Sequence, residues 1–139
     1  MESCLKVDSS AFVADPELIE LLEKRSVPFV CDQDRVLFDQ GDAPGGLYIL
    51  LKGEAYMTLK APSGEVVLCI QPSVGSLLGL PALIGHEPYS MTARALKGSE
   101  FGLVSHEDFD DLMQTVPSMP LRILHVLASE VRAARQALL

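Results

Sequence analysis

The sequence predicts a mainly β domain with flanking helices: a double-stranded β-helix, or jelly-roll-like β-roll, between an N-terminal helix and a long C-terminal dimerisation helix. Three observations favour this fold. Short apolar runs separated by Gly, Pro and Asp turns fill residues 27–105. Helical patterning is confined to the segments before and after that stretch. Strands do not alternate with helices, as they would in a parallel α/β sheet.

Size and charge limit the classes of function. The 139 residues suffice for a single domain, with a leader and helix over 1–26, the β-roll over 27–105 and two helices over 106–139. The net charge of -8 disfavours direct contact with nucleic acids and with anionic membranes. The start lacks the pattern of a secretory signal, and the apolar run at 74–85 is too short and broken for a membrane span. We therefore expect a cytoplasmic protein with no membrane partner.

The first helix is predicted to begin at Asp15-Pro16-Glu17, where Asp15 caps, Pro16 suits the first turn and Glu17 complements the helix dipole. The β-roll that follows is expected to contain eight short strands. Their predicted ranges are 29–31, 35–39, 46–52, 54–60, 65–70, 76–78, 90–96 and 100–104.

Two helices are predicted after the roll. Ser105 and Asp108 form a capping-box pattern that begins the first of them. Pro117 and Pro120 interrupt the chain, and the last helix is expected from Leu121 onward. Along it an apolar stripe at 3-4 spacing, with one arginine in the seam, predicts pairing with a second copy of the chain, although packing within one monomer is the alternative. The residues of this stripe are Leu121, Leu124, Ala128, Val131, Arg135 and Leu138.

The three cysteines, Cys4, Cys31 and Cys69, form no C-x-x-C motif. We predict three unpaired, inert thiols in a reducing compartment, with no zinc or redox motif. The histidines His86, His106 and His125 are widely separated and fit no metal-ligand spacing. Catalytic motifs such as G-x-S-x-G, H-E-x-x-H and the P-loop are absent from the sequence. We therefore expect no enzyme activity and no metal, and keep a cupin-like metal protein as a remote alternative.

Residues 37–53 carry a more specific signal: an apolar pair, the turn Gly41-Asp42, a small-residue loop, four apolar residues and the closing Gly53. This order resembles the first signature of cyclic-nucleotide-binding domains. Together with the terminal helices, it is similar to the sensor half of Crp/Fnr transcription regulators over nearly the whole chain. The resemblance implies a homodimeric sensor whose last helix signals to an output. DNA would then be reached only through a helix-turn-helix module that is absent from this chain.

The same resemblance places a phosphate-binding cassette at residues 74–93. In that family a Gly-Glu pair, a short helix and an Arg before Ser/Thr hold the ligand's ribose and cyclic phosphate. The candidate site residues that match this cassette are Gly75, Ser76, Leu77, Leu78, Gly79, Tyr89 and Ser90. Ser76 stands in place of the Glu and Tyr89 in place of the Arg, while the adenine-contacting positions of the last helix fall at Ala134 and Arg135 and do not match.

These losses predict a degenerate cassette. Each charged hydrogen bond to phosphate contributes about 1.5–3 kcal/mol, so ordinary binding of cyclic AMP should not survive. A cyclic nucleotide or another small ligand remains the candidate, and Leu77, Leu78 and Leu80 either belong to the core or line its pocket. The competing hypothesis is a working cyclic AMP or cyclic GMP receptor that uses backbone amides, Ser76, Ser90 and Arg94. The alternation of residues 92–94 does not settle which way Arg94 points.

Overall fold

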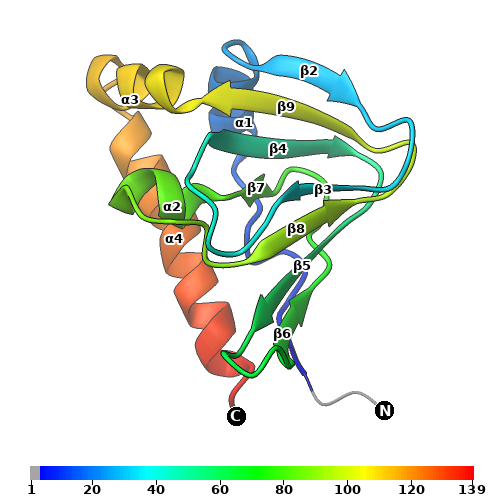
Figure 1. The fold of residues 1–139 in the computed structure, drawn as a ribbon. Coiled ribbons are helices and arrows are strands. Elements are labelled where there is room, and N and C mark those ends of the chain that lie inside the picture. The colour runs from blue at the N-terminus through cyan, green and yellow to red at the C-terminus, as the bar shows by residue number, and fades with distance from the viewer. Residues whose placement is uncertain (1–3) are drawn as a thin grey trace.

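The computed structural model describes residues 4–139 and contains two facing β-sheets (Figure 1). The five-stranded sheet has the order β1 (Leu5–Lys6), β6 (Val66–Ile70), β5 (Ala55–Lys60), β8 (Thr92–Ala95) and β3 (Arg35–Phe38). The four-stranded sheet has the order β2 (Val27–Val30), β9 (Glu100–Ser105), β4 (Gly46–Lys52) and β7 (Leu77–Leu78). The predicted β-roll is confirmed, and each predicted strand overlaps an observed one.

The core lies between the sheets because alternate side chains of each strand point inward. Ala93 and Ala95 of β8 are fully buried, for example, whereas Arg94 between them is exposed. The inward residues Phe38, Leu50 and Phe101 belong to this core. A second cluster lies between the four-stranded sheet and the helices, and includes Leu18, Leu47, Phe109 and Ile123.

The helices before and after the roll begin where the capping patterns predict. In α1 (Pro16–Glu23) the carboxylate of Asp15 accepts a hydrogen bond from the amide of Leu18 at 2.9 Å. In α3 (His106–Thr115) the hydroxyl of Ser105 accepts one from the amide of Asp108 at 3.1 Å. Both side chains satisfy amides that the first helical turn leaves without partners.

The last helix, α4 (Met119–Gln136), runs along one side of the roll (Figure 1). It begins two residues before the predicted start at Leu121, because Pro120 occupies the first turn, where no amide hydrogen is required. Arg122 joins it to the start of α1 through ion pairs with Asp15 at 2.9 Å and Glu17 at 2.6 Å. A further short helix, α2 (Leu80–Gly85), lies inside the roll sequence, where the resemblance places the cassette helix.

The cysteine prediction is wrong for two of the three residues. Strand β1, which the sequence left inside an unpatterned leader, runs parallel to β6 with Lys6 opposite Cys69. This pairing brings Cys4 and Cys69 into a disulfide, across 65 residues of sequence. Cys31 is a buried free thiol, as predicted.

Candidate ligand site

The cassette begins with backbone turns that glycine allows. Gly75 and Gly79 have φ values of +94° and +96°, in the left-handed region that L side chains rarely adopt. At Gly79 there is also no space, because a Cβ atom would lie 2.8 Å from Cε1 of Tyr89. Gly79 therefore lets the Tyr89 ring pass beside the start of α2.

Tyr89 occupies the position where the resemblance expects an arginine. Its side chain is buried, with 5% of its surface exposed, and its ring stacks on Phe38 at 3.8 Å between centroids and 14° between planes. Its hydroxyl accepts hydrogen bonds from the amides of Gly45 and Gly46, both at 3.1 Å, and donates one to the carbonyl of Gly46 at 2.7 Å. A phenolic oxygen has one donor and two acceptor sites, so this hydroxyl has none left for a ligand.

A small cavity of about 50 Å³ lies beside Tyr89. Residues from the N-terminal segment, β3, β5, both sides of the cassette and α4 line it: Phe12, Phe38, Met57, Gly79, Pro81, Ala82, Tyr89, Ser90, Met91 and Glu130. Its lining contains one carboxyl group and no lysine, arginine or histidine. This cavity therefore offers no cation.

Three of the seven predicted site residues, Gly79, Tyr89 and Ser90, line this cavity. The other four do not. Leu77 and Leu78 are fully buried in the two core clusters, which favours the core interpretation of these leucines. Ser76 is also buried, and its hydroxyl has no hydrogen-bond partner within the described chain. Gly75 serves as a turn and packs near Ile19 of α1.

Arg94 does not replace the missing cation. It lies in β8 directly opposite Tyr56 of β5 and Val36 of β3, on the outer face of the five-stranded sheet. The inner face at this point belongs to Ala93 and Ala95, which are fully buried. The sequence did not settle which way Arg94 points. The strand pairings show that it lies on the face of β8 opposite to the buried alanines, away from the core.

Glu130 is the site residue that sequence reasoning missed. The resemblance pointed to Ala134 and Arg135, and both are exposed. Glu130 lies about one turn earlier, on the inward stripe of α4 that also contains Ile123, Val126 and Ala133. An acid at an apolar stripe position was the signal that could have found it.

The Glu130 carboxyl is in an unusual environment. Its Oε2 is shielded from solvent and has no hydrogen-bond partner among residues 4–139. Burial raises the pKa of Glu130 to about 8, because removing a carboxylate from water disfavours its charged form. The carboxyl is therefore mostly protonated at neutral pH.

The opposite face of α4 carries the stripe predicted for dimerisation. Leu121, Leu124, Val131 and Leu138 are exposed, Leu124 over 57% of its surface and Val131 over 50%. Ala128 and Arg135 are exposed as well. All six residues of this stripe are therefore exposed in the single chain.

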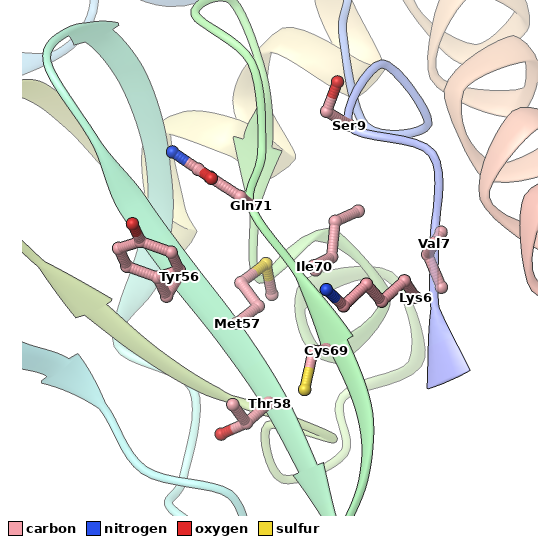
Figure 2. Close-up of a pocket in the computed structure, with 9 residues that line it drawn as sticks. All are labelled: Lys6, Val7, Ser9, Tyr56, Met57, Thr58, Cys69, Ile70 and Gln71. Atoms are coloured by element: carbon pink, nitrogen blue, oxygen red, sulfur yellow. The ribbon is translucent and has the colours of Figure 1, made fainter. Parts of the chain in front are cut away.

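A second pocket, of about 370 Å³, lies on the five-stranded sheet and shares Met57 with the cassette cavity (Figure 2). Its lining comes from the N-terminal segment, β5 and the end of β6: Lys6, Val7, Ser9, Tyr56, Met57, Thr58, Cys69, Ile70 and Gln71. Figure 2 shows the Lys6 side chain reaching toward β6. No site residue predicted from the sequence falls in this pocket.

Three further observations concern other functions. The rings of His86 and His106, which are distant in sequence, stack at 4.9 Å between centroids. Within residues 4–139, no group of three or more His, Cys, Asp or Glu side chains is arranged to hold a metal ion. In the same part of the chain, none of the helices has the length and apolar character that crossing a bilayer requires.

Comparison with known proteins matches residues 29–116 to the family model described as "Cyclic nucleotide-binding domain". Among solved structures, the chain is similar to the catabolite activator protein of Thermus thermophilus, with a TM-score of 0.73 and 24% identity over 89% of this chain and 58% of that one. It is also similar to the N-terminal domain of a transcriptional regulator from Streptomyces coelicolor A3(2), with a TM-score of 0.66 and 20% identity over 99% and 95%. These likenesses show the shared fold.

Among curated proteins, the chain is similar to patatin-like phospholipase domain-containing protein 6 of Mus musculus and of Homo sapiens, at 24% identity over 104 residues in each case. The match covers 75% of this chain and 8% of each relative. The likeness therefore concerns a small part of those proteins.

Proposed function

Because the chain belongs to the cyclic nucleotide-binding domain family, we propose that it is a non-enzymatic, dimeric sensor domain whose cassette no longer binds cyclic nucleotides in the usual way. The observation that carries this proposal is the position of Tyr89. Its ring is stacked and its hydroxyl is fully bonded at the position where the resemblance expects the arginine of a working cassette.

The electrostatics of the cavity support the same conclusion. A cyclic phosphodiester carries one negative charge, and burying it without a paired cation is costly. The nearest ionisable group on α4 is the carboxyl of Glu130, which would repel that charge when ionised. The cavity of about 50 Å³ is also far smaller than the roughly 300 Å³ or more of ordinary ligand pockets.

Titration calorimetry with cyclic AMP and cyclic GMP tests this part of the proposal. We expect no binding up to millimolar nucleotide at neutral pH. Micromolar binding of either nucleotide would instead support the competing hypothesis of a working receptor. The Tyr89→Arg variant is the comparison, because it restores a cation at this position. It also removes the hydrogen bonds of the hydroxyl to Gly45 and Gly46, so its fold is checked by urea unfolding before the titration.

The proposed output runs through α4. This helix carries Glu130 on the face toward the cavity and the exposed stripe of Leu124, Ala128 and Val131 on the other. A ligand that moves α4 against the roll would change the geometry of a dimer formed through that stripe. Any contact with DNA would require a further module, since the chain is acidic.

We also propose a cytoplasmic location, on the basis of the family to which the chain belongs. The Cys4–Cys69 disulfide bears on this point, because stable disulfides are uncommon in reducing compartments and those found there are usually redox-sensitive. Thiol labelling of protein that is acid-quenched directly from cells measures whether Cys4 and Cys69 are reduced or disulfide-bonded inside the cell.

A further inference from the structure

The Glu130 carboxyl has no partner in the described chain, and this requires an explanation. Most buried polar atoms in folded proteins are hydrogen-bonded, and an unsatisfied one indicates a strained, functional or ligand-binding group. Within residues 4–139, four buried side-chain atoms have no hydrogen-bond partner: Ser76 Oγ, His106 Nε2, Arg122 Nε and Glu130 Oε2. Of these residues, Glu130 is the one that lines the cassette cavity.

The groups that face Glu130 across the cavity are almost all uncharged. The N-terminal segment contributes Phe12, β3 contributes Phe38, and β5 contributes Met57. Helix α2 and the turn before it contribute Gly79, Pro81 and Ala82, and the segment after α2 contributes Tyr89, Ser90 and Met91. Tyr89 is the one other ionisable residue in this lining, and its hydroxyl is fully bonded to Gly45 and Gly46.

We propose that the cassette cavity binds a small organic ammonium ion through the carboxylate of Glu130. This inference rests on the proposed sensor function and names the ligand class of the same site. The polarity of the cassette would then be reversed: an acid on α4 receives a cation, where the family's usual arginine receives an anion.

The chemistry of the cavity favours an ammonium ion over other small ligands. Its N–H groups would satisfy the unpartnered Oε2, and its positive charge would compensate the carboxylate that the apolar surroundings disfavour. Met57, Met91, Phe12 and Phe38 would contact its carbon atoms, and aromatic faces also attract cations. An anion would meet no positive group, and a neutral alkane would leave Oε2 without a partner.

The size of the cavity limits the ligand. One water molecule occupies about 30 Å³ in the liquid, so about 50 Å³ accommodates one or two heavy atoms without rearrangement. Methylammonium fits this limit and is the probe of choice. Tetramethylammonium has the same charge, but it is larger and has no N–H donor, so it is the matched negative control.

Binding must release a proton, and this gives the proposal a specific signature. At neutral pH the protonated carboxyl of Glu130 loses its proton to solvent, and the carboxylate that remains pairs with the ammonium ion. The ligand keeps its own proton, since alkyl ammonium groups titrate near pH 10. Affinity should therefore rise roughly tenfold per pH unit below pH 7, and level off above the Glu130 pKa of about 8.

NMR titration of the whole chain with methylammonium chloride tests the proposal, with sodium chloride and tetramethylammonium chloride at equal ionic strength as controls. We expect saturable shifts in the amides of Gly79, Tyr89 and Glu130 with methylammonium alone, and a dissociation constant about tenfold larger at pH 6 than at pH 7. Glu130→Gln should abolish the shifts, whereas Glu107→Gln, at an exposed acid on α3, should keep them.

Equal shifts with tetramethylammonium, shifts that persist in Glu130→Gln, or no saturable shift at all would overturn the proposal. If Glu130→Gln does not fold, the pH dependence in the natural chain decides, because a constant affinity between pH 6 and pH 7 is incompatible with proton release. A failure here leaves the proposed sensor function intact, since that function is tested separately by the absence of cyclic-nucleotide binding.

Discussion

The hydroxyl of Tyr89 and the backbone of Gly46 form a reciprocal pair, in which the hydroxyl donates to the Gly46 carbonyl at 2.7 Å and accepts from the Gly46 amide at 3.1 Å. Gly46 begins β4 and also lacks space for a side chain, since a Cβ there would lie 2.7 Å from the carbonyl oxygen of Val104. The tyrosine therefore joins the end of the cassette to the first turn of the family signature. Its role is therefore structural, whatever the cassette binds.

Removing this hydroxyl should destabilise the fold. Tyr89→Phe keeps the stacking on Phe38 but leaves the amides of Gly45 and Gly46 without their partner, one of them buried. An unsatisfied buried group costs about 1–3 kcal/mol, so urea unfolding should show a loss of that size. Tyr56→Phe, at an exposed tyrosine on β5, is the control and should change stability by less than about 0.5 kcal/mol. Equal effects of the two substitutions would contradict the role given to Tyr89.

Stability should depend on pH through Glu130. Its pKa is raised from 4.5 to about 8 in the folded chain, so the folded state binds more protons than the unfolded state between these values. The contribution of Glu130 to stability is fully present below pH 4.5, falls as the pH rises toward 8, and is constant above it. The slope reaches at most about 1.4 kcal/mol per pH unit.

Urea unfolding from pH 5 to pH 9 measures this dependence. Glu130→Gln should remove the part of the slope that the natural chain shows in that window, because the amide does not titrate. Glu107→Gln should retain it. A natural chain and a Glu130→Gln variant with parallel profiles would show that Glu130 titrates normally.

The fold was largely predictable because its signals are local. The capping residues Asp15 and Ser105 and the apolar runs of the strands act over a few residues, and each led to an element that the structure contains. The correspondence of Tyr89 with the family's arginine also comes from the sequence, because it depends only on position within a motif, and it stays a prediction. The side of the sheet on which Arg94 lies could not be predicted from the sequence. Alternation shows that neighbouring residues lie on opposite faces, but the strand pairings of β8 and the burial of its alanines are needed to tell which face is which.

Two features could not be predicted because they depend on distant contacts. The Cys4–Cys69 bond requires β1 to lie beside β6, and a strand of two residues has no recognisable pattern. Whether Glu130 faces the cavity depends on the rotation of α4 about its own axis. The apolar stripe defines this rotation only to within about one residue. The resemblance drew attention to Ala134 and Arg135, which lie about one turn later on the same helix.

Reducing the disulfide should lower stability. A cross-link that closes a loop of this length reduces the conformational entropy of the unfolded chain, and a typical contribution is about 2–4 kcal/mol. Cys4→Ser and the natural chain in a dithiol reductant should therefore unfold at the same, lower urea concentration. Reductant should have no further effect on Cys4→Ser, since Cys31 is a free thiol. Unchanged stability on reduction would show that the bond adds nothing to the fold.

The exposed stripe of α4 should hold two copies of the chain together. Leu124 and Val131 lie seven residues apart, hence on one face of the helix, and both are at least half exposed in the single chain. Val131→Glu would place two like charges close to the axis of a paired helix and remove apolar contact area, so we expect a shift from dimer to monomer in sedimentation velocity at micromolar concentration. Val30→Glu is the matched control, since Val30 is 63% exposed on β2, outside α4. A dimer that survives Val131→Glu but dissociates in Val30→Glu would place the interface on the sheet. A natural chain that is monomeric at all concentrations tested would contradict a role for α4 in transmitting a change from the cavity to a second copy.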